Sequence, residues 1–186
     1  MSHGPSASAT TTVQVSVNGS QEILSNGFEA EPELRRPNVG VKIMKSISAD
    51  MIPEHFWRIR YDQNHDPNTP TLPSISDSPN CQNFAYALLK HFGFEIFPFR
   101  SSNLWQDSSE TYVVSDELRP FDLLLFNRTK NPWGAHVALH LGEDHAIHLS
   151  KKQLEPVIWP LARFIELAEY RTFIGAKRLR TIGVCP

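Results

Sequence analysis

The clearest alternation of apolar and polar residues in the chain begins at Ser78. After it, apolar residues recur every three or four positions, as on the buried face of a helix: Cys81, Phe84, Ala85, Leu88, Leu89 and Phe92. Ser78 suits the N-cap, Pro79 the first helical position, and Gly93 the end of this helix. The pattern therefore predicts an amphipathic helix with Cys81 on the buried edge of its first turn.

Short apolar runs after this helix predict strands. Residues 121–127 (FDLLLFN) form one run, and residues 136–141 and 145–150 form two more around Gly142-Glu143-Asp144. Residues 160–170 have a helical pattern, and residues 173–180 (FIGAKRLR) are typical of a closing strand. One helix packed on an antiparallel sheet of at least four strands is an α+β fold.

The N-terminal part has a different composition. Residues 1–36 are rich in Ser, Thr, Asn and Glu and poor in large apolar side chains, which predicts a flexible leader. Alternation at Val13, Val15 and Val17 leaves a short strand open there. We expect residues 37–186 to form one domain, with the chemistry within about residues 75–180.

Composition narrows the classes of partner. The net charge is −2 and 20% of the residues are charged, so nothing favours binding to nucleic acid or to an anionic membrane. No apolar run reaches the roughly 20 residues of a membrane span, and the N-terminus lacks a secretory signal pattern. We expect a cytoplasmic protein, or one exported without a cleaved leader. The sequence carries no indication of oligomeric state.

The two cysteines have to be interpreted singly. Cys81 and Cys185 are too few for a disulfide framework, and neither has the spacing of a structural zinc site. A thiol at a helix start meets unpaired backbone N–H groups, which favour the thiolate and offer an oxyanion hole. On position alone, however, a buried cysteine acting as a small apolar residue is the better interpretation of Cys81. A nucleophile also needs a general base.

The apolar runs around residues 142–144 supply a candidate base. If these three residues form the loop of a hairpin, Leu141 pairs with His145. His136 and His148 then lie diagonally on one face, about 7–8 Å apart along the backbone and within reach of each other's rings. A loop of two or four residues places them on opposite faces.

A metal site is the alternative use of these histidines. His136 and His140 have the i,i+4 spacing of a helical zinc motif, but the motif's glutamate is missing. On a strand, residues four apart lie about 13 Å from each other, too far to share one ion. We therefore expect no metal and no other cofactor, and we interpret His140 and His145 as locally hydrogen-bonded.

Four short motifs follow one another along the chain: Asn80-Cys81-Gln82-Asn83-Phe84, Phe121-Asp122-Leu123-Leu124-Leu125-Phe126, His136-Val137-Ala138-Leu139-His140-Leu141-Gly142 and Ala146-Ile147-His148. In this order they resemble the motifs of the NlpC-type cysteine peptidases, papain-like enzymes best known for cutting D-glutamyl to diamino-acid bonds in bacterial cell-wall peptides. FIGAKRL from Phe173 is similar to the closing strand of the family. The resemblance covers about residues 75–180.

The resemblance implies a papain-like fold and a catalytic set. In it, Cys81 is the nucleophile, His136 the base and then the acid to the leaving amine, and His148 the group that orients His136. Asp122 matches a position with a structural role. Asn80-Cys81 is also similar to the lecithin:retinol acyltransferase-like branch, but there the base precedes the cysteine, so the unpermuted branch fits better.

Departures from the family concern the substrate. Gln82 and Asn83 replace the small Ser-Gly that follows the nucleophile in the family. We expect them to crowd the site or to add polar contacts near the acyl group. The Tyr-x-Trp-Gly-Gly pattern is absent, and Tyr61 is not assigned its role.

Further substrate contacts are expected from the segment that follows the nucleophile helix. Arg100 can pair with a carboxylate, and Trp105 and Trp133 can wall a cleft. Each of the three is as well explained by a surface charge or a core aromatic.

The sequence thus predicts a cysteine-dependent amidase or peptidase that cleaves a small peptide or γ-glutamyl-type amide through a thioacyl intermediate. Two alternatives stay open. One is an acyltransferase that uses the same Cys/His pair, and the other is a catalytically silent binding module.

Overall fold

The computed structural model describes residues 45–64 and 74–180. Its elements, in chain order, are η1 (Ala49–Met51), α1 (Glu54–Trp57), α2 (Cys81–His91), α3 (Ser101–Gln106), β1 (Thr111–Val113), β2 (Leu123–Asn127), β3 (His136–Gly142), β4 (His145–Leu149), β5 (Pro156–Pro160), α4 (Leu161–Ile165) and β6 (Thr172–Leu179). The flexible leader expected at residues 1–36, with its possible strand at Val13 to Val17, lies outside the described residues.

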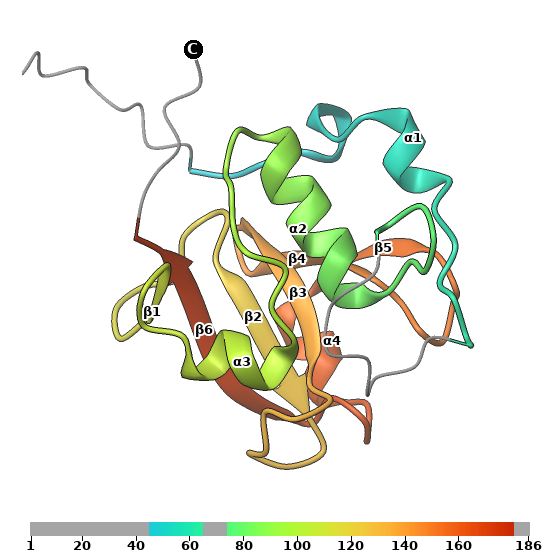
Figure 1. Cartoon of the computed structure of the whole chain (residues 1–186). Helices are drawn as coiled ribbons and strands as arrows, with labels where there is room; N and C mark the ends of the chain where they lie inside the picture. Colours follow the sequence, from blue (N-terminus) through green and yellow to red (C-terminus); the bar gives the residue numbers. More distant parts are fainter. Residues whose placement is uncertain (1–44, 65–73, 181–186) are drawn as a thin grey trace, which may run out of the picture. The chain divides into compact units, whose positions relative to one another are not determined.

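The strands form one antiparallel sheet in the order β1-β6-β2-β3-β4-β5 (Figure 1). The closing strand β6 lies between β1 and β2, so the end of the described chain returns to a position inside the sheet, next to the edge strand β1. The predicted α+β layout, a helix with Cys81 packed on an antiparallel sheet of four or more strands, is confirmed. The short strands β1 and β5 were not predicted; β5 has a proline at each end, which is unusual for a strand.

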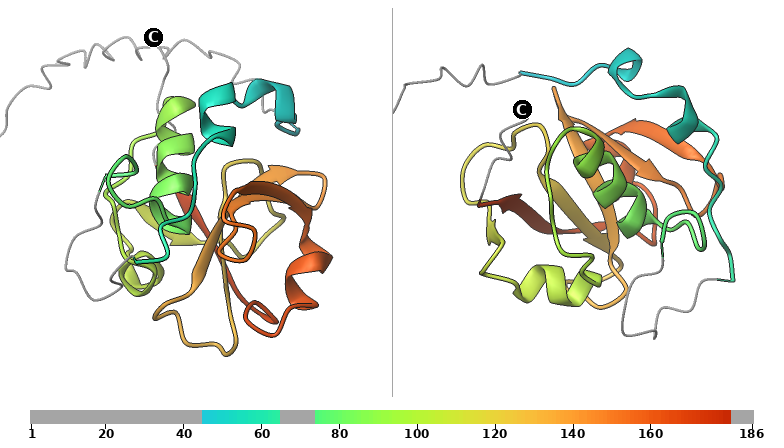
Figure 2. Two further views of the ribbon diagram at one scale, coloured as in Figure 1. Left: turned by 90° about the vertical axis from the view of Figure 1, so that its right-hand side faces the viewer. Right: turned by 45° about the horizontal axis from the view of Figure 1, so that its top comes forward.

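The sheet separates two apolar layers, because successive side chains of a strand point to opposite faces. Helix α2 covers one face, where Phe84 and Leu88 pack with odd-numbered β2 and β3 residues such as Leu125 and Leu139. Helix α4 lies on the other side (Figure 2, left), where its Phe164 packs with even-numbered residues of β2 and β3, among them Leu124, Phe126 and Ala138. The functional side chains described below are distributed over both layers.

Helix α2 begins two residues later than predicted. Its N-cap is Asn80, not Ser78, and Cys81, not Pro79, is its first residue. The Asn80 side chain accepts hydrogen bonds from the backbone N–H groups of Gln82 (2.9 Å) and Asn83 (3.1 Å), and Asn83 Oδ1 accepts one from Asn80 N–H (2.8 Å). This reciprocal capping box fixes the helix start, and with it the position of the thiol.

Two other segments differ from their sequence patterns. The helix expected over residues 160–170 is limited to α4, because the chain then tightens into turns closed by Leu167 N–H to Phe164 O and Tyr170 N–H to Leu167 O. These turns bring Tyr170 back to the sheet, where it is 6% exposed. The connection after α2 contains the unpredicted short helix α3, anchored by the buried Leu104.

No helix among residues 45–64 and 74–180 combines the length and the apolar character that crossing a membrane requires.

Candidate active site

Cys81 lies where helix α2 meets the sheet. It is the first residue of α2 and is 9% exposed. Backbone N–H groups of Cys81, Gln82 and Val137 interact favourably with the charged thiolate. The thiol is therefore set between a helix start and strand β3.

Burial raises the pKa of the Cys81 thiol, although these backbone N–H groups and the charge of Lys151 lower it in part. The sequence had led us to expect a lowered pKa, on the basis of the helix start alone. The difference has a physical cause, because desolvation penalises the thiolate more than the nearby N–H groups stabilise it. In the free protein, the neutral thiol is thus favoured.

The β3–β4 hairpin differs from its predicted form at the loop. Gly142, not Leu141, pairs with His145, so the predicted pairing is wrong and the loop has two residues, Glu143 and Asp144. Their positive φ angles, 49° and 56°, are those of a type I′ turn.

A bulge restores the predicted arrangement of the strands. The register shifts between His140 and Gly142, which leaves Leu141 as an extra residue in β3. Beyond the bulge, Leu139 pairs with Ile147. His136 and His148 therefore share a face, as predicted, although the loop is one residue shorter.

The two histidines are in direct contact. His136 is the first residue of β3, and its Nε2 lies 2.8 Å from Nδ1 of His148 in β4. The ring centroids are 4.8 Å apart with an interplanar angle of 89°. Sequence reasoning placed the two backbones diagonally, and the side chains close the remaining gap with one hydrogen bond.

Three aromatic rings enclose this pair. Tyr170 lies 4.5 Å from His136, and Trp159 and Phe164 lie 4.4 Å and 4.8 Å from His148, centroid to centroid. His136 is 6% exposed and His148 is 0% exposed. The second nitrogen of His148, Nε2, is buried and has no hydrogen-bond partner among the described residues.

The enclosure keeps both imidazoles neutral. Burial lowers the pKa of His136 to about 3. Burial, and the charge that a protonated His136 adds, lower the pKa of His148 well below its usual value. A neutral imidazole has one bare nitrogen, which is what a general base requires.

Cys81 and His136 line the same cleft, which has a volume of about 600 Å³. Tyr61, Trp133 and Tyr170 form apolar parts of its wall. His148 does not line this cleft; it contacts His136 from the enclosed side. The structure thus brings the three sequence-predicted residues into one site, with only the cysteine and one histidine facing the open space.

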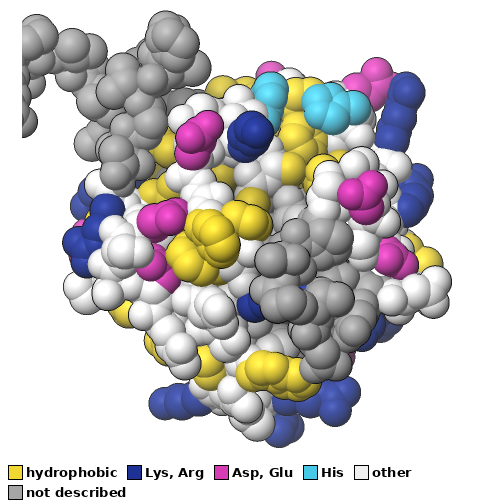
Figure 3. All heavy atoms as spheres, viewed as in Figure 1, with side chains coloured by type: hydrophobic (Ala, Val, Ile, Leu, Met, Phe, Trp, Pro, Cys, Tyr) yellow, Lys and Arg dark blue, Asp and Glu magenta, His cyan; other side chains and the backbone are white. Residues whose placement is uncertain are grey.

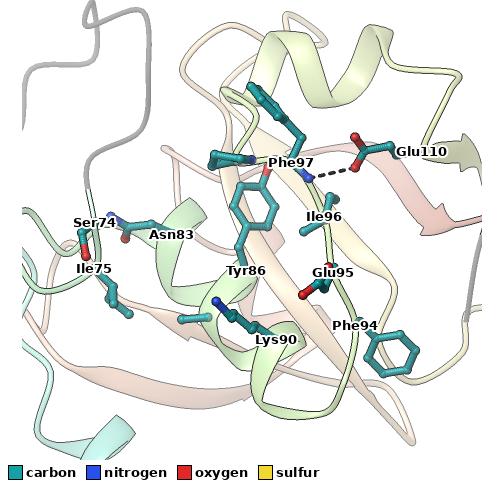
Figure 4. A pocket seen from close by; sticks show the side chains of 12 residues that line it. Ser74, Ile75, Asn83, Tyr86, Lys90, Phe94, Glu95, Ile96, Phe97 and Glu110 are labelled. Carbon is teal, nitrogen blue, oxygen red and sulfur yellow. Dashed lines mark hydrogen bonds between the residues drawn. The ribbon is translucent and has the colours of Figure 1, made fainter. Parts of the chain in front are cut away.

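The two residues after Cys81 are also buried, but neither of them lines the cleft. Gln82 is 7% exposed and does not line the cleft, and Asn83 is committed to the capping box and to the carbonyl of Ser78 (2.8 Å). Asn83 instead faces a second cavity of about 610 Å³ on the outer side of α2. Figure 4 shows Asn83 beside Ser74, with Tyr86 further along the helix. A contact of Asn83 with a substrate at Cys81 stays a prediction that this placement does not favour.

The other expected substrate contacts lie in different places. Trp133 lines the cleft and is 58% exposed. Arg100 is the N-cap residue of α3, outside the cleft lining. Trp105 packs over Gly175, where an added Cβ would lie 2.7 Å from the indole, and it too is outside the cleft lining. Of these three, only Trp133 shares the cleft with Cys81.

Several cleft residues were not predicted from the sequence. Lys151 and Lys152 come shortly after β4, the strand that carries His148, and Tyr170 comes shortly before β6. Their closeness in the sequence to the recognised motifs was the signal that could have indicated that they lie near the site. Tyr61 comes from a segment 20 positions before Cys81, and nothing local indicates that it reaches the cleft.

No group of three or more His, Cys, Asp or Glu side chains suited to a metal ion occurs in the described part of the chain. His136 and His148 bind each other through ring nitrogens, and Glu169 is the one carboxylate among the described residues that line the cleft.

Comparison with known proteins gives similarity at the level of solved structures. One is the crystal structure of an NlpC/P60 family protein from Bacillus cereus ATCC 10987, with 25% identity, 58% of this chain and 35% of that chain covered, and a TM-score of 0.42. Another is the NlpC/p60 domain of the peptidoglycan hydrolase SagA, with 20% identity, 62% of this chain and 86% of that chain covered, and a TM-score of 0.40.

The match thus spans about a third of the Bacillus cereus chain. Both solved structures are named as NlpC/P60 proteins, the family whose motifs the sequence resembles. No protein-family model and no curated protein matches the sequence.

Proposed function

We propose that this protein is a cysteine-dependent amidase or peptidase that cleaves a small peptide or γ-glutamyl-type amide through a thioacyl enzyme. One observation carries the proposal: Cys81 and His136 line one cleft, and His148 holds Nε2 of His136 at 2.8 Å. A nucleophile, a base and a group that orients the base are the parts that thiol catalysis needs.

The hydrogen bond within the pair decides which nitrogen acts as base. Nε2 of His136 is occupied by His148, so Nδ1 is the nitrogen available to the thiol. For Nδ1 to be bare, His136 donates its Nε2–H to Nδ1 of His148, and His148 carries its own proton on Nε2. That nitrogen is buried, and the Trp159 ring lies 4.4 Å from the His148 ring, centroid to centroid.

The reaction then follows from the neutral resting pair. As Sγ of Cys81 bonds to the amide carbon, its proton moves to Nδ1 of His136 and the carbonyl electron pair moves to oxygen. The oxyanion is stabilised by backbone N–H groups near the thiol. Collapse breaks the C–N bond, and the Nδ1 proton leaves with the amine.

Water completes the cycle. His136 takes a proton from water as the oxygen attacks the thioester, and the acid product leaves as the thiol is restored. Because burial disfavours both the thiolate and the imidazolium, proton transfer accompanies attack and no ion pair is stored beforehand.

The test is a panel of γ-glutamyl amides, short peptides and cell-wall-derived peptides, with products and acyl-enzyme read by mass spectrometry. We expect one or more to be cleaved, with a transient mass increase on Cys81. Cys81→Ala abolishes cleavage, whereas Cys185→Ala, the matched control, does not. His136→Gln lowers kcat about 10²–10⁴-fold, as loss of a general base does.

The proposal is wrong if Cys81→Ala retains the cleavage activity, or if no amide of the panel is cleaved and no acyl-enzyme forms. An added amine that diverts the product from acid to amide identifies the acyltransferase alternative at the same site.

A further inference from the structure

One edge of the molecule combines exposed aromatic side chains with a group of cations. Trp133, in the loop between β2 and β3, is 58% exposed, and Phe173, at the start of β6, is 43% exposed. Most other large apolar side chains of the described fold are buried in the two layers beside the sheet. Two aromatic side chains that stay in water at the same edge indicate a contact surface.

Hydrogen bonds join the two segments that carry these side chains. The Asn127 side chain donates to the carbonyl of Trp133 (3.1 Å), and Thr172 Oγ1 donates to the carbonyl of Arg128 (3.0 Å). Asn127 also pairs with Thr172 across β2 and β6. Residues 128–134 and 171–173 therefore form one continuous surface, which we call the rim.

The rim is cationic. Arg128, Lys130 and Arg171 are exposed, and the rim contains no Asp or Glu. Nε of Arg171 donates to the carbonyl of Arg128 at 3.2 Å, which holds the Arg171 side chain against the β2–β3 loop. Within the described part of the chain, none of the three cations forms an ion pair. The net charge of −2 is a sum over the whole chain and does not show this local excess.

The rim borders the cleft that holds Cys81. Arg128 and Trp133 belong both to the rim and to the lining of the cleft, and Lys151 and Lys152 line the cleft as well. In Figure 3, Lys and Arg side chains lie beside an apolar area along the lower edge of the molecule, where Figure 1 shows the β2–β3 loop. With the two lysines, five cations therefore lie near the opening of the cleft.

We propose that the rim docks this protein on an anionic lipid surface. Its two aromatic side chains enter the headgroup region, and its three cations contact anionic headgroups. The proposal does not depend on the proposed function, because it concerns where the protein binds and not which bond it cleaves. Docking through the rim turns the opening of the cleft toward the headgroups.

The aromatic side chains and the cations contribute in different ways. An aromatic ring is stabilised at a membrane–water interface because its apolar body leaves water. Each Lys or Arg close to an anionic bilayer strengthens binding about fivefold, and about four to eight of them are typical of surfaces that bind anionic lipids. The five cations near the cleft fall within this range.

A nucleic acid is the competing partner. Its phosphates would suit the cations as well as lipid phosphates do. However, a nucleic acid has no apolar phase that could bury Trp133 and Phe173 together. Stacking of bases requires an open ring face, and the Phe173 ring already packs against Phe126 with centroids 5.2 Å apart. A lipid surface uses both the charge and the apolar side chains of the rim.

Co-sedimentation of the full chain with vesicles tests the proposal. One vesicle is pure phosphatidylcholine, and the other contains phosphatidylcholine and phosphatidylglycerol in equal parts. We expect the partition coefficient to be about tenfold higher, or more, for the anionic vesicle. Salt at about 1 M, where the Debye length falls to about 3 Å, should reduce this excess. Equal partitioning into the two vesicles, or none into either, overturns the proposal.

A pair of charge variants locates the contact on the rim. Lys130→Glu should lower partitioning into the anionic vesicle about 30-fold, because it removes one attractive charge and adds a repulsive one. Lys90→Glu is the matched control, because it changes the net charge equally but lies in the last turn of α2, outside the rim. No loss in Lys130→Glu, or an equal loss in Lys90→Glu, overturns the assignment to the rim.

A pair of apolar variants separates insertion from attraction between charges. Trp133→Ser should lower partitioning about tenfold, since its ring no longer leaves water. Val113→Ser is the matched control, because Val113 is 50% exposed but lies on β1, which pairs with the other end of β6. Urea unfolding verifies that each variant is folded, and Lys130→Glu carries the test if Trp133→Ser is not.

Two outcomes contradict the lipid surface directly. Full partitioning of a folded Trp133→Ser variant shows that the aromatic side chain does not insert. Tighter binding to single-stranded DNA than to the anionic vesicle, at the same salt concentration, shows that the rim is a nucleic-acid surface.

Discussion

At the scale of single residues, burial and local contacts have opposite effects on the ionisation of the site residues. His136 and His148 lie in an aromatic enclosure that disfavours protonation, and Cys81 lies where burial outweighs the backbone N–H groups. Each of the three is therefore neutral at rest near neutral pH. In the mechanism proposed above, the site becomes reactive when a substrate supplies the carbonyl oxygen that takes up the negative charge.

The neutral histidine pair makes the stability of the fold dependent on pH. An unfolded histidine binds a proton below about pH 6.5, whereas folded His136 does so only near 3. Between these values the unfolded chain binds more protons, so the free energy of unfolding falls as the pH is lowered. We expect a slope approaching about 1.4 kcal/mol per pH unit for each histidine of the pair.

Urea unfolding between about pH 5 and 7, above the range in which most carboxyl groups titrate, measures this slope. His136→Gln removes one of the two contributions and should flatten the curve. His145→Gln is the matched control, because His145 is exposed at the start of β4. A free energy of unfolding that does not change over this range contradicts the prediction.

At the scale of elements, the β3–β4 hairpin sets the position of the pair. The bulge at Leu141 compensates for the two-residue loop, and the carbonyl of Leu141 accepts a hydrogen bond from Ile47 N–H at 2.7 Å. Gly142 has a φ of +97°, and a Cβ added there would clash with the carbonyl oxygen of Lys45. The segment at Lys45 thus closes over the hairpin and leaves space only for glycine.

Two glycine variants separate backbone strain from this steric contact. Gly134 also has a positive φ, +68°, but an added Cβ there meets no atom within 4 Å. We expect Gly134→Ala to cost about 1–2 kcal/mol of unfolding free energy, from the left-handed backbone alone. Gly142→Ala adds a contact with backbone and should cost about 2–4 kcal/mol. Equal losses in thermal or urea unfolding contradict the steric explanation.

Local signals in the sequence allowed the strands of the two histidines and their shared face to be predicted. The bulge and the exact helix start were missed, because they involve contacts that the local pattern does not show. Alternating apolar residues placed His136 and His148 on strands, and their shared face followed from pairing. The bulge was not predicted; at this residue the Leu141 carbonyl accepts a hydrogen bond from Ile47, which lies far away in the sequence, so no local pattern indicates the contact. The helix start was placed too early, because Ser78 is also a good N-cap and the choice depends on the reciprocal bond to Asn83.

At the scale of the whole described fold, the site lies where two layers meet across the sheet. Cys81 belongs to the helix on one face, while Phe164, Trp159 and Tyr170 form the enclosure of the histidines on the other. Tyr61 and Lys151 reach the cleft from segments far apart in the chain. The charge and shape of the cleft therefore depend on the complete packing of the sheet, which no short motif encodes.

The apolar layer between helix α4 and the sheet should control the protonation of the His136–His148 pair without contacting the substrate. Phe164 is fully buried, lies 4.8 Å from His148 and stacks on Phe126 at 4.4 Å. Phe164→Leu removes part of the enclosure, so we expect it to cost about 1–3 kcal/mol of stability and to raise the pKa of the histidine pair toward the usual value. Ile147→Val is the matched control, because Ile147 is equally buried on β4 but packs in the α2 layer. It should cost about 0.5–1.5 kcal/mol and leave the titration unchanged. NMR titration of the imidazole protons, together with urea unfolding, measures both quantities. An equal pKa change in the two variants would show that general loosening, and not the aromatic enclosure, sets the protonation of the pair.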